Sequence, residues 1–140
     1  MDKVSKVIYS TAATAKGGRV GQVTSADGVL DLALGKPGSN SNPKANPETL
    51  FAAAYAACFG GALNLVASQQ GLDTSESSVT ADVTFGQTDS GAGLAVAIKA
   101  SVPGVDVETA QRLADAAHDM CPYSKATRGN IEVTVEATAA

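Results

Sequence analysis

The chain has 140 residues, of which ten are basic and fourteen acidic, so its formal net charge at pH 7 is −4. This length predicts a single domain over residues 1–140, large enough to bury a core without disulfides or bound metals. Because the sequence has no basic cluster that could neutralise phosphates, we exclude nucleic acid as a partner. Residues 1–6 lead into an alternating segment rather than an apolar leader, so we expect a cytoplasmic protein.

Residues 6–34 are expected to form a β-meander with two tight turns. The turns fall at residues 16–18, which read Lys-Gly-Gly, and at Asp27-Gly28, and both are typical of hairpins. Leu30, Leu32 and Leu34 alternate, which would place them on one face of the last strand. Residues 35–46 are rich in Pro, Gly, Asn and Ser and indicate a polar loop that leads to the next element.

The stretch over residues 46–70 predicts a long central helix. Asn46 suits the N-cap, Pro47 suits the first helical position, and Glu48 complements the positive end of the helix. Gly71 marks the end of the helix. Residues 50–67 carry no charge, and apolar side chains lie on every side of the helical wheel. Such a helix must be surrounded by protein rather than lie on a surface.

A membrane span is the alternative explanation for this apolar run, because its 18 residues are at the lower limit for crossing a bilayer. We exclude a membrane, since Ala and Gly make up most of the run, Asn64 interrupts it, and no Lys or Arg cluster flanks it. The remaining elements of one chain could hardly enclose the helix. We therefore expect a homodimer in which two central helices pack together.

Beyond the central helix, alternating apolar residues predict a hairpin over residues 79–102. Asp106 would then cap a second helix with one apolar stripe, which Cys121 continues and Pro122 ends. Residues 131–135 alternate again and predict a closing strand. Strands on both sides of a central helix indicate the α+β class, with antiparallel sheets packed on the buried central helix and the second helix.

The two cysteines, Cys58 in the central helix and Cys121 at the end of the second, allow two interpretations. Both could be small core residues, as free cysteines often are. Alternatively, an oxidant converts Cys58 to a sulfenic acid, which Cys121 resolves as a disulfide, because a cysteine pair in a reducing compartment is more often redox-active than structural. Two cysteines and one histidine are too few ligands for zinc, so we expect no metal.

A buried thiol needs a nearby cation to react, because desolvation raises its pKa and the thiolate is the nucleophile. The central helix has no cation, which leaves Arg19, Arg112 and Arg128 as candidates. We favour Arg19, since the two glycines before it allow a close approach of its backbone; an exposed arginine on a hairpin is the alternative. Glu48 could orient the guanidinium of Arg19, or could simply complement the helix dipole.

Two polar residues of the second helix are assigned no role in the chemistry. Arg112 and His118 fall on its polar face, where we expect both side chains to be solvated. The sequence also contains no arrangement typical of a Ser-His-Asp hydrolase.

The chain contains three motifs in a specific order. They are Gly17-Gly18-Arg19, NPETLFAAAYAACF at residues 46–59, and CPYSKATRGNI at residues 121–131. Together they resemble the organic hydroperoxide resistance proteins, which belong with the osmotically inducible protein C (OsmC) group. The resemblance extends over essentially the whole chain and implies an OsmC-like fold that forms an intertwined homodimer.

The resemblance also implies an activity, that of a thiol peroxidase that needs no cofactor. In this family pattern Cys58 attacks the peroxide, Cys121 resolves the sulfenic acid, and Arg19 with Glu48 activates the thiolate. Dithiols of the lipoyl type, such as a lipoylated protein, would reduce the disulfide. The residue after the arginine is often acidic in this family but is Val20 here, which leaves the tuning of Arg19 by that neighbour open.

An organic hydroperoxide is the substrate that the resemblance implies. An apolar pocket would suit its organic substituent, and the candidate lining residues are Phe51, Tyr55, Phe59 and Tyr123. Two other functions remain open at this point. A non-catalytic redox sensor or an apolar-ligand-binding dimer would use the same cysteines and pocket without turnover, and a purely structural dimer would have inert cysteines.

Overall fold

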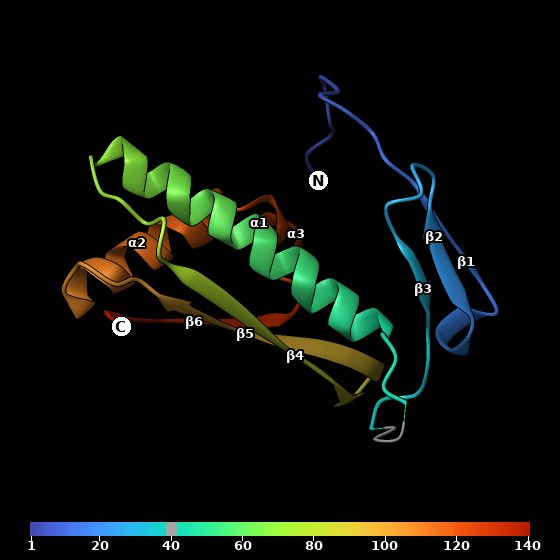
Figure 1. Ribbon diagram of the computed structural model, residues 1–140. Coiled ribbons are helices and arrows are strands. Elements are labelled where there is room, and N and C mark those ends of the chain that lie inside the picture. The colour runs from blue at the N-terminus through green and yellow to red at the C-terminus, as the bar shows by residue number, and fades with distance from the viewer. Residues whose placement is uncertain (39–41) are drawn as a thin grey trace. The chain divides into compact units, whose positions relative to one another are not determined.

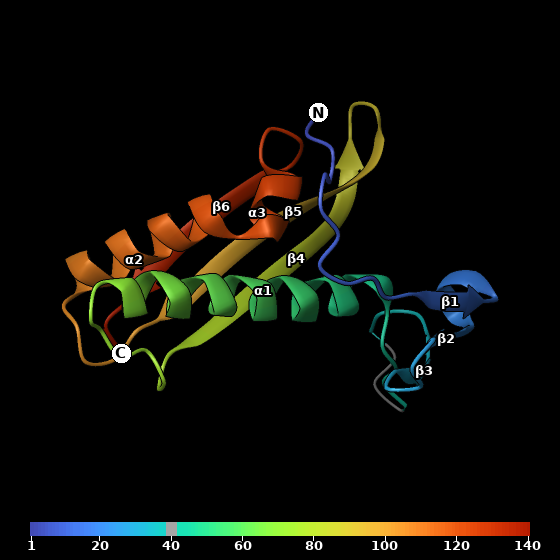
Figure 2. The same ribbon diagram turned by 90° about the horizontal axis from the view of Figure 1, so that it is seen from above.

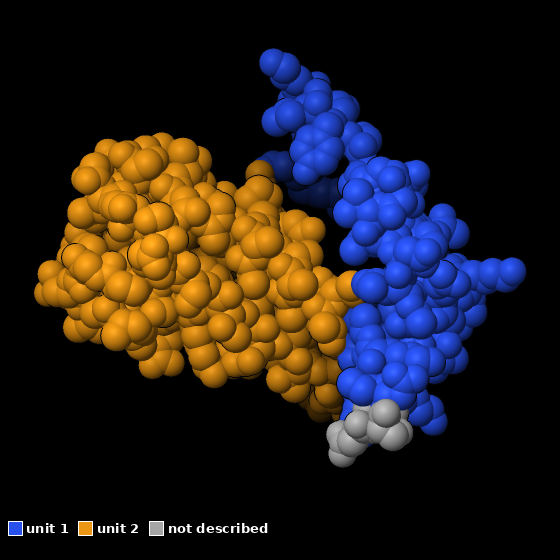
Figure 3. Space-filling view, viewed as in Figure 1, with its two compact units in different colours: residues 1–47 blue, residues 48–140 orange. Residues whose placement is uncertain are grey.

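The computed structural model describes residues 1–38 and 42–140. The chain forms two compact units, residues 1–47 and residues 48–140, which Figure 3 colours separately. The expectation of one domain over the whole chain stays a prediction.

The first unit is built on a three-stranded antiparallel sheet. Its strands are β1 (Ala13–Lys16), β2 (Gln22–Ser25) and β3 (Asp31–Ala33), in that order. Both predicted turns are present, the first as a short 3-10 helix, η1 (Gly18–Val20). The predicted meander is confirmed, although its first strand begins at Ala13 rather than near residue 6.

The glycines of the first turn have separate roles. Gly17 and Gly18 have φ values of +81° and +61°, a backbone region that favours glycine. Close approach occurs instead at Gly21, where a Cβ atom would collide with the carbonyl oxygen of Lys16. Arg19 therefore lies in a turn whose shape depends on glycine at both ends.

Helix α1 (Pro47–Gln69) is the predicted central helix. It begins at Pro47, and Gly71 beyond its end has a φ of +70°. One side of the helix is buried, through Tyr55, Phe59, Ala62, Leu63, Val66 and Ala67. The opposite side is exposed, and Leu65 on it is 50% accessible. One chain therefore buries only one side of a helix that is apolar all round.

The composition of α1 would also allow it to cross a membrane. It is the one helix in the described residues that is long and apolar enough, but the core helix of a soluble protein meets the same criteria. Its buried side belongs to the same apolar core as Ile98 of the sheet and Leu113 of the second helix. This packing is the arrangement of a core helix.

The second unit contains a mixed three-stranded sheet, in the order β4 (Ser78–Thr88), β5 (Gly91–Ser101) and β6 (Glu132–Thr138). The β4–β5 hairpin is antiparallel as predicted, but β6 runs parallel to β5, so the expectation of purely antiparallel sheets is wrong here. Parallel neighbours need a long crossover, which the two helices between β5 and β6 supply. Both α1 and these helices lie on one face of the sheet (Figures 1 and 2).

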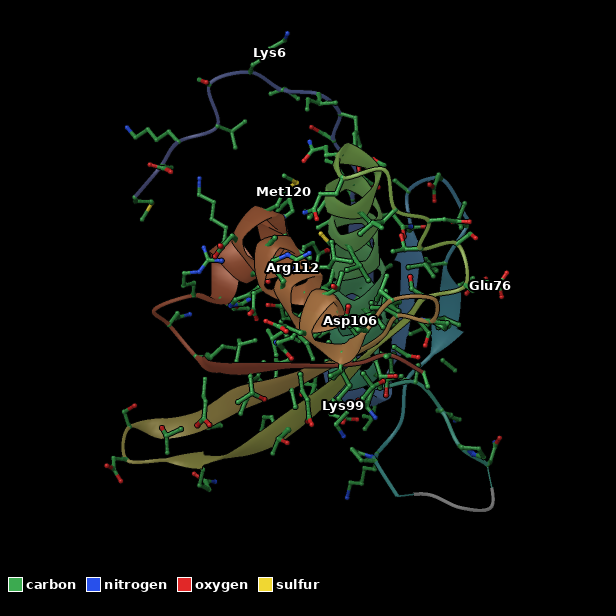
Figure 4. The ribbon with its side chains drawn as sticks, turned by 90° about the vertical axis from the view of Figure 1, so that its left-hand side faces the viewer. Lys6, Glu76, Lys99, Asp106, Arg112 and Met120 are labelled. Carbon is green, nitrogen blue, oxygen red and sulfur yellow. The ribbon has the colours of Figure 1, made fainter. Side chains whose placement is uncertain are left out.

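Helix α2 (Val107–Met120) follows β5, with Asp106 and Met120 labelled at its ends in Figure 4. Asp106 is the predicted cap: its Oδ1 accepts a hydrogen bond from the backbone N–H of Thr109 at 2.7 Å. The predicted apolar stripe is buried in its middle and exposed at both ends. Pro122 ends α2 as expected but also begins a short helix that the sequence did not predict, α3 (Pro122–Thr127).

Candidate active site

The two cysteines lie next to each other in the second unit. The Sγ atom of Cys121 donates to the Sγ atom of Cys58 at 3.6 Å, and both residues are free thiols. Cys58 is half-buried near the middle of α1, whereas Cys121 is fully buried between α2 and α3. The fold therefore brings together two thiols that are 63 residues apart in the sequence.

The surroundings of Cys58 keep its thiol protonated. Burial is the main cause that raises its pKa above the ordinary value of 9.0, and the neighbouring Cys121 raises it further. A backbone hydrogen bond from Tyr123 acts in the opposite direction but does not reverse the effect. Within this unit Cys58 is thus a weak nucleophile at neutral pH, which agrees with the argument that a cation must be added.

The three arginines considered as cations for Cys58, and the acid Glu48, lie on different elements of the chain. Arg19 lies in η1 of the first unit, and Glu48 lies in the first turn of α1. Their action on Cys58 stays a prediction. Arg112 is exposed, as expected. The guanidinium of Arg128 donates to the carbonyl oxygen of His118 at 2.6 Å, so this arginine is held at the end of α2.

The four aromatic residues predicted to line the substrate pocket differ in their contacts and in their accessibility. The ring of Tyr55 lies 5.9 Å from that of Phe51 and 5.9 Å from that of Tyr123, so these three form a continuous group. Phe51 and Tyr123 keep some exposure, Tyr123 at 38%, whereas Tyr55 and Phe59 are fully buried. Only Phe51 and Tyr123 of the four present accessible ring surface in this chain.

A buried polar network lies beside the cysteines. The hydroxyl of Tyr55 contacts Ser124 Oγ at 2.8 Å and Thr127 Oγ1 at 3.1 Å, and His118 Nδ1 contacts Ser124 Oγ at 2.7 Å. The expectation of a solvated His118 is wrong, because α3 folds back onto the end of α2 and brings Ser124 against the ring. Sequence reasoning also missed Ser124 and Thr127, whose spacing of three places both on one side of a helical turn.

No group of three or more His, Cys, Asp or Glu side chains that could hold a metal ion occurs among residues 1–38 and 42–140. The second unit places two thiols in contact and three aromatic rings, those of Phe51, Tyr55 and Tyr123, next to one another.

Comparison with known proteins identifies the family. The model of the OsmC-like protein family matches residues 38–136, which is well over half of the chain. The chain belongs to the OsmC-like family. Within the family it is 47% identical over 139 residues to an organic hydroperoxide resistance protein of Xanthomonas axonopodis pv. citri, covering 96% of this chain and 98% of the relative.

Two further matches agree with this membership. This OsmC-like chain is 44% identical to the organic hydroperoxide resistance protein OhrB of Bacillus subtilis, covering 92% of this chain and 97% of the relative. The crystal structure of an organic hydroperoxide resistance protein from Elizabethkingia anophelis superposes with a TM-score of 0.89 at 48% identity, covering 96% and 99% of the two chains. The predicted α+β, OsmC-like fold is confirmed.

Proposed function

We propose that this chain is a cysteine-based thiol peroxidase that reduces organic hydroperoxides to alcohols. The observation that carries the proposal is the 3.6 Å separation between the half-buried sulfur of Cys58 and the buried sulfur of Cys121. The relatives named as organic hydroperoxide resistance proteins support the substrate class. No cofactor is needed, because all electrons pass through the two thiols.

The proposed reaction has two steps in the protein. The Cys58 thiolate attacks the outer peroxide oxygen; the S–O bond forms, the O–O bond breaks, and the alkoxide takes a proton to leave as the alcohol. Cys121 then attacks the sulfur of the Cys58 sulfenic acid, and the hydroxyl leaves with the thiol proton as water. The product is a Cys58–Cys121 disulfide. The order follows from burial, since peroxide can reach Cys58 more easily than Cys121.

Activation of Cys58 is assigned to Arg19 and Glu48. Burial raises the pKa of Cys58, so the thiolate needs a positive charge within about 4–6 Å. Arg19 would supply that charge and stabilise the charge that develops on the peroxide oxygen, with Glu48 orienting the guanidinium. Val20 stands where the family often has an acidic residue, so no acid directly follows Arg19 in this chain.

The organic substituent of the substrate is assigned to the aromatic group beside Cys58. Phe51 and Tyr123 offer accessible ring surface, and the buried rings of Tyr55 and Phe59 support them from behind. Apolar contact with such a surface favours alkyl and aryl hydroperoxides, because each buried CH₂ contributes about 0.8 kcal/mol. Hydrogen peroxide has no group that could use this surface.

The assembly and the reductant complete the proposal. A homodimer would cover the exposed side of α1, which one chain leaves open. We assign disulfide reduction to a dithiol, of the lipoyl type that the family resemblance implies and carried by a lipoylated protein. A cytoplasmic location fits a cycle that needs a steady supply of reduced dithiol.

A turnover assay tests this function. The protein is mixed with an aryl hydroperoxide and dihydrolipoamide, and hydroperoxide consumption is followed beside a parallel reaction with hydrogen peroxide. We expect many turnovers with the organic substrate. Consumption of one equivalent per site, followed by arrest despite the dithiol, would instead indicate a redox sensor. Absence of any reaction, with both thiols unchanged, would indicate an apolar-ligand-binding or structural dimer.

A further inference from the structure

The buried polar network ties together the three helices that hold the cysteines. Tyr55 lies on α1 three residues before Cys58, and Ser124 lies on α3 three residues after Cys121. His118 lies in the last turn of α2, three residues before Cys121. The contacts of Ser124 with Tyr55 and His118 therefore connect both sides of Cys121 to the helix that carries Cys58.

Each member of the network has a hydrogen-bond partner, and the three members that carry a hydroxyl are buried. Tyr55 and Ser124 are fully inaccessible and Thr127 is 6% accessible, whereas the ring of His118 is half-buried. Removing one member leaves a donor or acceptor of its buried neighbour without a partner, which costs more than the bond itself contributes. The network is therefore sensitive to the loss of any single member.

Counting hydroxyl protons gives the network a direction. Tyr55, Ser124 and Thr127 carry one each, and the proton of Thr127 goes to the carbonyl oxygen of Ser124, 3.2 Å away. All contacts are then satisfied when Tyr55 donates to Thr127, Ser124 donates to Tyr55, and His118 donates from Nδ1 to Ser124. This count makes the imidazole the first donor, which no hydroxyl in the set can replace.

The position of α3 matters because Cys121 is its N-terminal neighbour. The carbonyl oxygen of Cys121 accepts from the N–H of Lys125 at 2.9 Å, so α3 and Cys121 move as one piece. A disulfide requires the sulfurs to approach from 3.6 Å to about 2.05 Å in a specific direction. If α3 were free to shift, the sulfur of Cys121 would move out of the direction needed to attack the sulfur of Cys58.

We propose that His118 is a positioning residue for the attack of Cys121 on oxidised Cys58, and that it acts by donating from Nδ1 to Ser124. In the step concerned, Cys121 forms a bond to the Cys58 sulfur, a leaving group departs from that sulfur, and the thiol proton is released. The leaving group is hydroxide, protonated to water, in the peroxidase cycle. The inference rests on the proposed function only for the identity of that group.

The test therefore uses an aromatic disulfide in place of the peroxide. One equivalent per chain reacts with the half-buried Cys58, which forms a mixed disulfide and releases one aryl thiolate. Cys121 then attacks the Cys58 sulfur and releases the second aryl thiolate with a proton. Stopped-flow absorbance of the aryl thiolate separates the two releases, and Cys121→Ser, which can give only the first, identifies them.

Three substitutions of His118 give the expected pattern. In His118→Ala the first release is unchanged, and the second is about tenfold slower, the effect of one buried hydrogen bond. His118→Asn restores the second release, because the amide nitrogen of Asn can occupy the place of Nδ1. His118→Gln does not restore the second release, since the amide nitrogen of Gln lies as far from the backbone as Nε2 and not at the place of Nδ1. The Asn and Gln variants match in polarity and differ only in where the donor lies.

Gln111→Ala is the control for general loosening of α2. Gln111 donates to Asp115 and to the carbonyl oxygen of Val135 and accepts from the N–H of Ala137. None of these three partners belongs to the network, so the second release should stay at the normal rate. An equal rate of closure in all three His118 variants and the unsubstituted protein would overturn the proposal, as would equal slowing in His118→Asn and His118→Gln.

The same variants keep this inference separate from the proposed function. If the predicted pattern appears but the unsubstituted protein consumes no organic hydroperoxide, the peroxidase function is wrong and the positioning role stands. If hydroperoxide turnover is normal and closure in His118→Ala is unimpaired, only the positioning role is wrong.

Discussion

The sulfur of Cys121 lies 3.6 Å from the sulfur of Cys58, in contact but not bonded. The two thiols differ in access, because Cys121 is fully buried and Cys58 only half-buried. Any oxidant from solvent should therefore meet Cys58 first, and Cys121 should react only with a species already formed on Cys58. This order separates the effects of replacing each cysteine.

Replacing Cys58 and replacing Cys121 should interrupt the reduction of hydroperoxide at different steps. Cys58→Ser should abolish hydroperoxide consumption, since the attacking sulfur is lost. Cys121→Ser should consume about one equivalent and stop at the sulfenic acid, as the two-step chemistry requires. Mass spectrometry of the protein after exposure to an aryl hydroperoxide, with a sulfenic-acid trap, distinguishes these products. Full turnover by Cys58→Ser would contradict the proposed function.

Substrate preference should depend on the accessible rings. We expect kcat/KM for an aryl or fatty-acid hydroperoxide to exceed that for hydrogen peroxide, by about fourfold for each CH₂ group buried. Tyr123→Ala should reduce the preference by lowering only the organic value, because hydrogen peroxide does not use the ring. Steady-state kinetics with a series of alkyl hydroperoxides measures both effects. Equal specificity constants across the series would argue against an apolar substrate site.

Much of this fold could be predicted because its main elements carry local patterns. The central helix was placed almost to the residue, since Pro47 and Gly71 mark its ends and the run between them is uncharged. The direction of β6 could not be predicted, because alternating residues give the same pattern in parallel and antiparallel strands. Helix α3 was missed because six residues are too few to show helical periodicity.

The site was predictable to a similar extent. The two cysteines were predicted to form a redox-active pair, and the fold places them in contact. The role of His118 was misjudged because its neighbours along α2 are polar, whereas its partner Ser124 reaches it only when α3 folds back. Hydrogen bonds between elements leave no periodic trace in a sequence.

Arg19→Ala should raise the pKa of Cys58 and slow its reaction with hydroperoxide. Burial already raises this pKa, and removing the proposed cation would leave only the weaker opposing effect of the backbone hydrogen bond from Tyr123. We expect kcat/KM to fall by about two orders of magnitude, the size seen when one charge-stabilising group is removed. Thiolate absorbance and the alkylation rate as functions of pH measure the change. Arg112→Ala, which removes an exposed arginine from α2, is the control and should leave both unchanged.

The stability of the protein should fall as His118 becomes protonated. Burial is the main cause that lowers the pKa of His118 below its ordinary value of 6.5, and Arg128 lowers it further, while Asp119 and Asp115 act in the opposite direction. The unfolded chain therefore binds the proton more readily than the folded chain. The resulting stabilisation is present above pH 6.5 and is lost as pH falls through 6.5 towards the lower folded pKa.

Urea denaturation at a pH above and a pH below this range measures the effect. The free energy of unfolding should decrease more between the two pH values in the unsubstituted protein than in His118→Asn, which cannot titrate. Asp106, whose pKa is lowered from 3.8 by its capping hydrogen bonds with Thr109, titrates at still lower pH and does not contribute in this window. An identical decrease in both proteins would show that the ring titrates alike in the folded and unfolded chains.

The geometry of α1 leads to a prediction about which chain supplies each residue. Glu48 and Cys58 lie ten residues apart on one unbroken helix, which separates them by roughly 15 Å along its axis. A charge shifts a pKa strongly only within about 4–6 Å, so we expect Glu48, together with its proposed partner Arg19, not to serve the Cys58 of the same helix. They would serve the Cys58 of a second chain whose α1 packs antiparallel about a two-fold axis. That packing would also cover the exposed side of α1.

Mixed dimers test this arrangement. Cys58→Ser chains, which should be inactive, and Arg19→Ala chains, which should be strongly impaired, are combined under conditions that allow subunit exchange. Exchange is verified by mass labelling. A mixed dimer has one site with both the thiol of one chain and the guanidinium of the other, so about half of the normal activity per dimer should return. Mixing Cys58→Ser with Cys121→Ser chains is the control: both thiols of a site come from one chain, so no complete site can form. Verified exchange without recovery in the first mixture would mean that Arg19 acts on its own chain, and that its turn reaches Cys58 without Glu48.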